Sequence, residues 1–212
     1  LAVARWMIEQ GARHVALLGR RGPTSAVDIA LRDLRQLGAE VAVFAVDVAV
    51  KSQVMAALDR IRESLPPLRG IVHAAGVLEN APIVDLDAGR MARVMDPKVA
   101  GAWNLHVATT GLPLDFFVLF SSAVSVLGSP GQGNYAAANA FLDVLAHHRH
   151  RLGLPALSIN WGPWAEIGLV ASGDFRHPPG RAATDGVKSI TPEHGLEALG
   201  RAVREDSPQL TV

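Results

Sequence analysis

Few residues in this sequence could carry out tyrosine or lysine chemistry. The chain has one tyrosine, Tyr135, and three lysines, among them Lys98. Tyr135 and Asn139 are four residues apart, so on a helix they share one face, and Ser121 and Ser122 end the apolar run that precedes them. A phenol with a pKa near ~10 is a weak acid at neutral pH unless a cation stabilises its anion. Lys98 could be that cation, but it lies 37 residues upstream, so catalytic and structural roles for Tyr135 both stay open.

Arg20 and Arg21 are candidates for binding a phosphate. They follow the apolar run 14–18 and lie about twenty residues after the start of the first helical pattern. At this distance an NAD-binding protein carries an acid for the ribose 2′-hydroxyl, whereas an arginine suits the 2′-phosphate of NADP. Two guanidinium groups can offer planar bidentate donors to a phosphate. The alternative interpretation is a solvated turn that carries two charges.

Two further strand ends could lie against a flat ligand. Asp47 follows the β-branched run 41–46, where it could accept a hydrogen bond from an adenine amino group or cap the helix behind it. Ala74, Ala75 and Gly76 follow the next run, and their small size would permit close approach of a ligand. Any tight turn would suit these small residues equally well.

The run of residues 147–151, with the sequence HHRHR, invites a metal hypothesis. Helical spacing scatters its imidazoles over different faces, and the arginines between them repel a cation. We therefore predict a solvated helix end here and no metal site.

Apolar runs alternate with helical patterns along the chain. The predicted strands span 14–18, 41–46, 71–73, 116–121 and 156–160, and the predicted helices span 1–10, 25–37, 52–64, 87–109, 134–152 and 192–204. This alternation predicts an α/β fold, a Rossmann-like doubly wound parallel sheet with helices on both faces. Ligands of such sheets bind at the carboxyl ends of the strands, where the candidate residues lie. Residues 165–190 are rich in glycine, proline and arginine and are predicted to form a loop or lid.

The opening of the chain departs from the usual order of this fold. Doubly wound folds open with a strand and a glycine-rich turn before the first helix, but here the helical pattern begins at Leu1. We expect this strand and turn to be missing from an N-terminally truncated domain. Their loss is expected to leave a gap in the middle of the sheet and to remove the backbone cradle for a pyrophosphate.

Composition excludes several classes of protein. The 212 residues suit one domain, and 49% hydrophobic residues can build a core. The formal charge is zero and the chain has no cysteine, which argues against nucleic-acid binding and excludes disulfides, thiolate metal sites and a cysteine nucleophile. No apolar run approaches the ~18 residues that span a bilayer, and no leader opens the chain. We expect a cytoplasmic protein with no membrane contact.

Taken together, the motifs resemble the ketoreductase domains of modular or iterative polyketide synthases, within the short-chain dehydrogenase/reductase superfamily. The resemblance runs nearly from end to end, from residues 2–6 to the region near Leu199. Its most specific fragments are HAAGVL at 73–78, DPKVAG at 96–101, FSS at 120–122, GQGNYAAAN at 131–139 and NWGPW at 160–164. Each fragment alone is weak, but five in the same order are specific.

The resemblance implies a catalytic set. In this family the catalytic tyrosine is followed four residues later by asparagine, as Tyr135 is by Asn139, and the catalytic lysine falls at Lys98 on the preceding long helix. Ordinary short-chain dehydrogenases have the lysine and the asparagine exchanged. The family's serine lies thirteen residues before the tyrosine, which selects Ser122 over Ser121. Lys98 would lower the pKa of the tyrosine and hold the nicotinamide ribose.

The resemblance also implies a cofactor and partners. The cofactor would be NADPH, and the substrate a β-ketoacyl chain tethered to the phosphopantetheine of an acyl carrier protein. Other domains of a parent synthase, including a reductase-like structural subdomain, would be further partners. The implied cofactor contacts are Arg20, Arg21, Asp47, Val48, Ala74, Ala75, Gly76, Lys98, Gly162 and Trp164.

Two further expectations concern stereochemistry and activity. B-type ketoreductases, which give the D-hydroxyl product, carry Leu-Asp-Asp where this chain has Leu78, Glu79 and Asn80. A-type domains carry a tryptophan eight residues before the tyrosine, where this chain has Leu127. The missing tryptophan favours the B-type. The alternatives to a β-ketoacyl reductase are a redox-inactive or epimerising domain and a structural half-domain that needs a partner.

Overall fold

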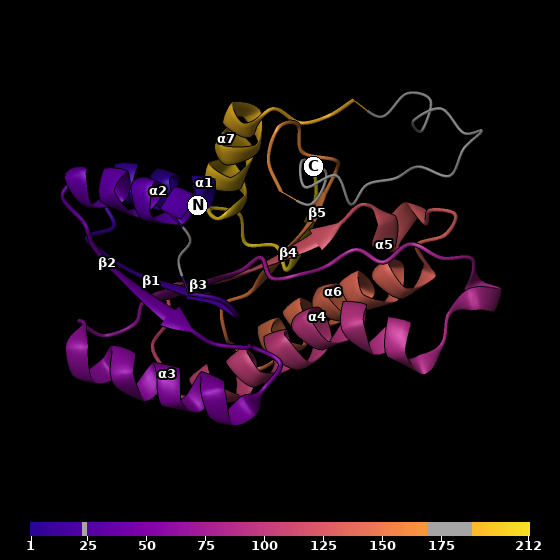
Figure 1. Ribbon diagram of the computed structural model, residues 1–212, viewed down its shortest axis with the longest axis horizontal. Helices are drawn as coiled ribbons and strands as arrows, with labels where there is room; N and C mark the ends of the chain where they lie inside the picture. Colours follow the sequence, from indigo (N-terminus) through magenta and orange to yellow (C-terminus); the bar gives the residue numbers. More distant parts are fainter. Residues whose placement is uncertain (23–24, 169–187) are drawn as a thin grey trace.

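The computed structural model describes residues 1–22, 25–168 and 188–212. Helices and parallel strands alternate along it, as predicted (Figure 1). The helices are α1 (Ala2–Glu9), α2 (Ser25–Gln36), α3 (Lys51–Ser64), η1 (Ile83–Asp85), α4 (Ala88–Thr109), α5 (Val124–Leu127), α6 (Gly133–Arg151) and α7 (Pro192–Ala202). The strands are β1 (His14–Gly19), β2 (Glu40–Ala45), β3 (Gly70–His73), β4 (Phe116–Ser122), β5 (Leu157–Trp161) and β6 (Gln209–Thr211).

The strands form two parallel sheets rather than one. The first contains β1 and β2, and the second has the order β3-β4-β5-β6. Within the described residues β1 pairs only with β2, and β3 only with β4. The predicted gap in the middle of a doubly wound sheet is therefore present. Strand β6, which adds to the edge of β5, was not predicted because its three residues are too few to show a pattern.

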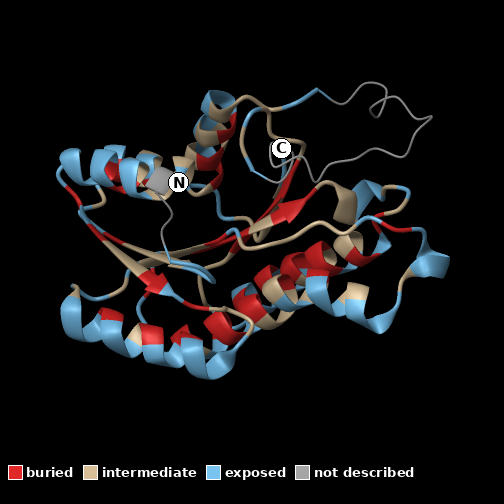
Figure 2. Cartoon of the chain, in the orientation of Figure 1, coloured by how far each residue is buried: buried red, intermediate tan, exposed pale blue. Residues whose placement is uncertain are grey.

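Helices cover both faces of the strands (Figure 1). Helices α3, α4 and α6 lie on one face, and α1, α2 and α7 lie on the other. Strand β1 alternates accordingly, with Ala16 and Leu18 packed toward the first layer and Val15 and Leu17 toward the second. The buried residues follow these contacts along the inner sides of the helices, as Figure 2 shows. The hydrophobic cores thus hold the helices against the strands.

Helix α1 connects the two sheets. Its buried Ala4 and Ile8 pack with the core of β1, β2 and α2, whereas Val3 and Trp6 pack against the core of β4, β5 and α7. This division follows from helical periodicity, because the two pairs lie on different faces of the helix. Packing of α1 and of the α3–α4–α6 layer therefore connects sheets that share no hydrogen-bonded strands.

The end of α6 corrects one prediction. Arg149 lies in the run predicted to be solvated, yet its side chain is fully buried. Its guanidinium carbon lies 3.9 Å from the centroid of the Phe117 ring, its Nε donates to the Pro155 carbonyl at 3.1 Å, and an Nη lies 3.0 Å from His106 Nδ1. The prediction was wrong because the last turn of α6 packs against β4, which periodicity alone did not reveal. The histidines at 147, 148 and 150 are exposed, as predicted, although the His148 ring lies edge-on to that of His106 with centroids 5.6 Å apart.

Among the described helices, none combines the length and the apolar character that a membrane crossing requires.

The contact between His106 and Arg149 predicts a pH-dependent stability. Burial lowers the pKa of His106, and the charges of Arg149 and His148 lower it further. The unfolded chain therefore binds the proton more readily, so stability falls as the pH drops below about 6.5. We expect His106→Gln, which keeps an acceptor without titrating, to lose less stability than the parent between about pH 7.5 and about pH 5.5 in urea unfolding. The exposed control His147→Gln should behave like the parent, and an unchanged pH dependence in His106→Gln would refute the interpretation.

Candidate active site

Four predicted catalytic residues meet where β4, α4 and α6 adjoin. Ser122 ends β4, Lys98 lies on α4, and Tyr135 and Asn139 lie on α6. Lys98 Nζ donates to the Phe120 carbonyl at 2.9 Å and lies 5.5 Å from the centroid of the Tyr135 ring. Local spacing could not bring the two side chains together, but the packing of α4 beside α6 does.

Close approach of α4 to the strands makes this possible. Gly101 lies three residues after Lys98 and is buried. A Cβ atom there would lie 2.8 Å from Val48 Cγ2 and 3.3 Å from His73 Cε1. A larger residue would push α4 away from β3 and the turn after β2, so glycine is required for close packing rather than for an unusual backbone angle.

Burial determines the charge states of Lys98 and Tyr135. It lowers the pKa of Lys98 to about 8, although the negative charge of Asp143 opposes the shift. Burial also raises the pKa of Tyr135 above its usual value, while the neighbouring side chains of Asn139 and Ser122 lower it. The lowering of the Tyr135 pKa that burial outweighs thus comes from Asn139 and Ser122, and not from Lys98 as expected. Tyr135 keeps its proton at neutral pH, as a proton donor must.

Ser121 and Ser122 have different surroundings. Ser121 Oγ donates to the Asn139 carbonyl at 3.2 Å, so it joins β4 to α6. Ser122 Oγ accepts from the Val124 N–H at 3.3 Å, which leaves its hydroxyl hydrogen available to donate. This difference supports Ser122 as the serine that contacts substrate.

Asn139 is buried beside Tyr135. Its Nδ2 donates to the Tyr135 carbonyl at 2.8 Å, which holds the amide along the helix. Its Oδ1 is buried and has no hydrogen-bond partner in the described part of the chain. A buried acceptor without a partner is costly, so this oxygen is suited to receive a proton donor from a ligand or water.

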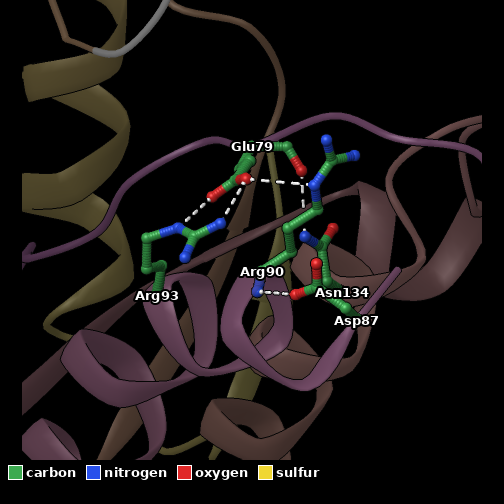
Figure 3. Close-up of polar contacts among 5 residues, drawn as sticks. All are labelled: Glu79, Asp87, Arg90, Arg93 and Asn134. Atoms are coloured by element: carbon green, nitrogen blue, oxygen red, sulfur yellow. Dashed lines mark hydrogen bonds and ion pairs between the residues drawn. The ribbon is translucent and has the colours of Figure 1, made fainter. Parts of the chain in front are cut away.

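The loop after β3 is attached to the helix that carries Tyr135 (Figure 3). Arg93 holds the Glu79 carboxylate with two hydrogen bonds of 2.7 and 2.8 Å, and Arg90 Nε lies 3.5 Å from the same carboxylate. The Glu79 carbonyl accepts from Asn134 Nδ2 at 2.9 Å, and Asn134 Oδ1 accepts from the Tyr135 N–H at 2.8 Å. The loop that carries the stereochemical marker positions is therefore fixed to α4 and to the start of α6.

The residues predicted to contact the phosphate and the adenine lie at the carboxyl ends of β1 and β2. Arg20 and Arg21 follow β1 and are exposed. Asp47 Oδ1 accepts from the Ala49 N–H at 3.0 Å, and the N-cap residue of α3 is Val50. The alternative in which Asp47 caps α3 is therefore wrong. Its carboxylate accepts from the Ala49 N–H and so closes the turn that precedes the helix.

The neighbouring cofactor candidates have small side chains or none beyond the backbone, apart from Val48. Val48 and Ala75 are half-buried, Ala74 is exposed, and Gly76 follows them after the end of β3. Asn104 of α4 was not predicted, yet its Nδ2 donates to the carbonyls of Val48 and Ala49 at 2.9 and 3.0 Å. The signal in the sequence that could have indicated Asn104 was a polar asparagine inside an otherwise helical pattern.

Gly162 and Trp164 follow β5. The Gly162 N–H donates to the Val212 carbonyl at 2.9 Å. The ring of Trp164 stacks on Phe120 with centroids 6.4 Å apart, and it packs so closely under α7 that a Cβ atom at Gly195 would overlap it. Of the predicted lid at 165–190, residues 169–187 lie outside the described residues.

Within the described ranges, no group of three or more histidine, aspartate or glutamate side chains could hold a metal ion.

Comparisons with known proteins show the family to which the chain belongs. The family model of the KR domain matches residues 1–166. The chain is 43% identical over 211 residues to polyketide synthase GfsB of Streptomyces halstedii, covering 99% of this chain and 4% of that protein. A solved structure of A-type ketoreductases from a modular polyketide synthase is 40% identical with a TM-score of 0.90, and the match covers 99% of this chain and 44% of that one.

A more distant structure shares the fold alone. The short-chain dehydrogenase from Burkholderia cenocepacia, solved in complex with NADP, is 19% identical with a TM-score of 0.79, and the match covers all of this chain and 90% of that one. The structure thus has the fold of the short-chain dehydrogenases. More narrowly, the chain belongs to the ketoreductase (KR) domains of polyketide synthases. It spans only a small part of the synthases that it matches.

Asn134 should matter more for stability than the exposed ion pair beside it. Asn134→Ala removes two hydrogen bonds from a fully buried site and should cost about 1–3 kcal/mol in urea unfolding. Arg93→Met removes a mainly exposed pair and should cost less. Equal losses in the two variants would contradict the anchoring of the loop through Asn134.

Proposed function

We propose that this chain reduces the β-keto group of an acyl thioester, carried by an acyl carrier protein, to a β-hydroxyl group with NADPH. The observation that carries the proposal is the buried Lys98 ammonium, 5.5 Å from the Tyr135 ring centroid, with Asn139 on the same helix as the tyrosine. Burying a cation beside a protonated phenol is costly for folding, which favours a catalytic purpose over a structural one.

The residues present fit an NADPH molecule along the carboxyl ends of the strands. Arg20 and Arg21 would hold the 2′-phosphate, because they are exposed at the end of β1. Asp47 and Val48 would border the adenine, and the small residues 74–76 leave room beside the ribose. The remaining contacts would come from Lys98, Gly162 and Trp164. The buried Oδ1 atom of Asn139 supports a polar ligand or water in this place.

The residues of the chain then have defined roles. NADPH, when bound, supplies the hydride that adds to the β-carbon of the substrate. Tyr135 donates its proton to the carbonyl oxygen as negative charge develops there, and the Ser122 hydroxyl donates a hydrogen bond to the same oxygen. Lys98 stabilises the phenolate that remains, and Asn139 orients Lys98 or a water that returns the proton.

The proposal includes the parent synthase. We propose that residues 1–212 form one NADP-binding catalytic domain, working in the cytoplasm beside a reductase-like structural subdomain and an acyl carrier protein. Among the described strands β1 and β3 each pair on one side only, which supports a further strand between them. The same unpaired edges favour the second candidate, a half-domain that needs a partner to become active.

The stereochemical expectation stays a prediction. Glu79 and Asn80 stand at the B-type marker positions, and Leu127 stands where A-type domains have tryptophan. The similarity to an A-type structure is the competing observation. The configuration of the hydroxyl product distinguishes the two, with the D-hydroxyl expected.

Replacing the proposed proton donor should lower turnover far more than it lowers binding. We expect Tyr135→Phe to lower kcat/KM for a β-ketoacyl thioester by about 10²–10⁴-fold and Ser122→Ala by about 10²–10³-fold. NADPH affinity, measured by its fluorescence, should stay the same, because both groups act mainly in the transition state. Activity is measured as NADPH consumption, in this chain and in an N-terminally extended chain. Equal losses of turnover and affinity would contradict the assigned roles.

The pH dependence of kcat/KM should report the ionisation of Lys98. Its pKa of about 8 predicts that kcat/KM falls as the pH rises through that region, because the ammonium loses its proton. Lys98→Arg, which does not titrate there, should lose this alkaline limb even if its activity is low. A profile that stays flat to about pH 10 in the parent chain would argue against the role of the ammonium.

A further inference from the structure

A buried carboxylate lies one helical turn beyond the proposed catalytic residues. Asp143 follows Asn139 by four residues on α6, so Tyr135, Asn139 and Asp143 form one stripe along this helix. Only 7% of Asp143 is exposed. In the described ranges, no arginine, lysine or histidine lies within ion-pair distance of it. A buried charge without a direct counter-ion is expensive and calls for a reason.

Three side chains satisfy the oxygens of Asp143. Ser125 Oγ donates to Oδ2 at 2.7 Å, and Ser158 Oγ donates to Oδ1 at 2.6 Å. The amide nitrogen of the fully buried Asn160 lies 3.0 and 2.9 Å from the two oxygens. These donors come from α5 and β5, and hydrogen bonds to a carboxylate are stronger than those between neutral groups.

The same donors contact the end of β4 that carries the proposed catalytic serine. Asn160 Nδ2 also lies 3.1 Å from Ser121 Oγ, and Ser121 Oγ donates to the Asn139 carbonyl. Ser125 Oγ lies 2.8 Å from the Ser122 carbonyl as well as close to the carboxylate. The carboxylate of Asp143 therefore connects α6 with the Ser121–Ser122 end of β4 through one shell of polar side chains.

Charge connects Asp143 with Lys98 as well. Asp143 is the carboxylate whose charge raises the pKa of Lys98 against the effect of burial. The other titratable groups near Lys98 are His73 on β3 and Tyr135 on α6. His73 is neutral, because burial and the Lys98 charge lower its pKa to about 3, and Tyr135 is a neutral phenol. Among the described residues, Asp143 is thus the carboxylate whose charge acts on Lys98.

We infer that Asp143 is a positioning residue: its buried carboxylate holds the Ser121–Ser122 end of β4 against α6, at the same strand end to which the Lys98 ammonium donates, and so acts on that ammonium. The inference stands on the hydrogen bonds that join Asp143 and Lys98 to the end of β4, while its catalytic consequence rests on the proposed function. Asn160 acts through Asp143, because its amide contacts both carboxylate oxygens and the Ser121 hydroxyl.

The test uses the small number of lysines. With lysine labelled by ¹³C at Cε, this chain gives three lysine signals, and Lys98→Arg identifies the signal of residue 98. In the parent chain this signal should titrate near pH 8. In Asp143→Asn, which keeps the shape and removes the charge, the midpoint should fall by about one pH unit or more. Asp143→Glu, which keeps the charge, should stay close to the parent, and the exposed control Asp115→Asn should not change it.

The outcomes separate a charge role from a structural one. A folded Asp143→Asn that is less stable but has an unchanged Lys98 midpoint would overturn the inference, as would a parent midpoint near the ordinary lysine value. If Asp143→Asn does not fold, the Lys98 midpoint is measured in Asp143→Ser, which leaves room for water beside Asn160. An unchanged midpoint in that variant, or a parent midpoint near the ordinary lysine value, would again overturn the inference.

Activity then distinguishes this inference from the proposed function. If the parent reduces a β-ketoacyl thioester, the alkaline limb of kcat/KM should move down in Asp143→Asn together with the lysine midpoint. If the lysine midpoint moves but no chain oxidises NADPH, the charge relation stands and the proposed reaction fails. If the alkaline fall of kcat/KM stays at the same pH while the lysine midpoint moves, the catalytic consequence is overturned. The fall would then not report the ionisation of Lys98.

Discussion

The site depends on the burial of one ammonium group. Lys98 is only 3% exposed, and it lies between the end of β4 and the ring of Tyr135. Removing an ammonium from water costs several kcal/mol unless hydrogen bonds and opposite charge compensate for it. Here the hydrogen bond to the Phe120 carbonyl and the charge of the more distant Asp143 compensate for part of this cost. The part that is not compensated lowers the pKa of Lys98. The close packing of α4 at Gly101 and the polar side chains around Asp143 on α6 both contribute to the surroundings of this one group.

The sequence predicted the order of elements well, because each long helix and strand carries its own apolar period. It also placed the candidate residues at strand ends, since a parallel sheet brings those ends to one edge. The spacing of Tyr135 and Asn139 was enough to place both side chains on one face of a helix. Short elements such as α5 and β6 escaped prediction, because a few residues cannot display a period.

Long-range relations were beyond the sequence pattern. Lys98 reaches Tyr135 only because α4 and α6 pack together, so the family resemblance, and not the local spacing, predicted the pair. The burial of Arg149 depends on β4, which lies far away in the chain. Asp143 looked like an ordinary helical carboxylate, because its partners Ser125, Ser158 and Asn160 come from other segments of the chain.

The most direct test of this account follows the hydride into the product. NADPH labelled with deuterium on its transferable position is incubated with a β-ketoacyl thioester, in this chain and in an N-terminally extended chain, and the product is examined by mass spectrometry and chiral chromatography. The account predicts one deuterium on the β-carbon of a D-hydroxyl product, formed about 10²–10⁴-fold more slowly with Tyr135→Phe. A chain that binds NADPH but yields no labelled product, or that yields it equally without the Tyr135 hydroxyl, would contradict the assignment of this site as a ketoreductase centre.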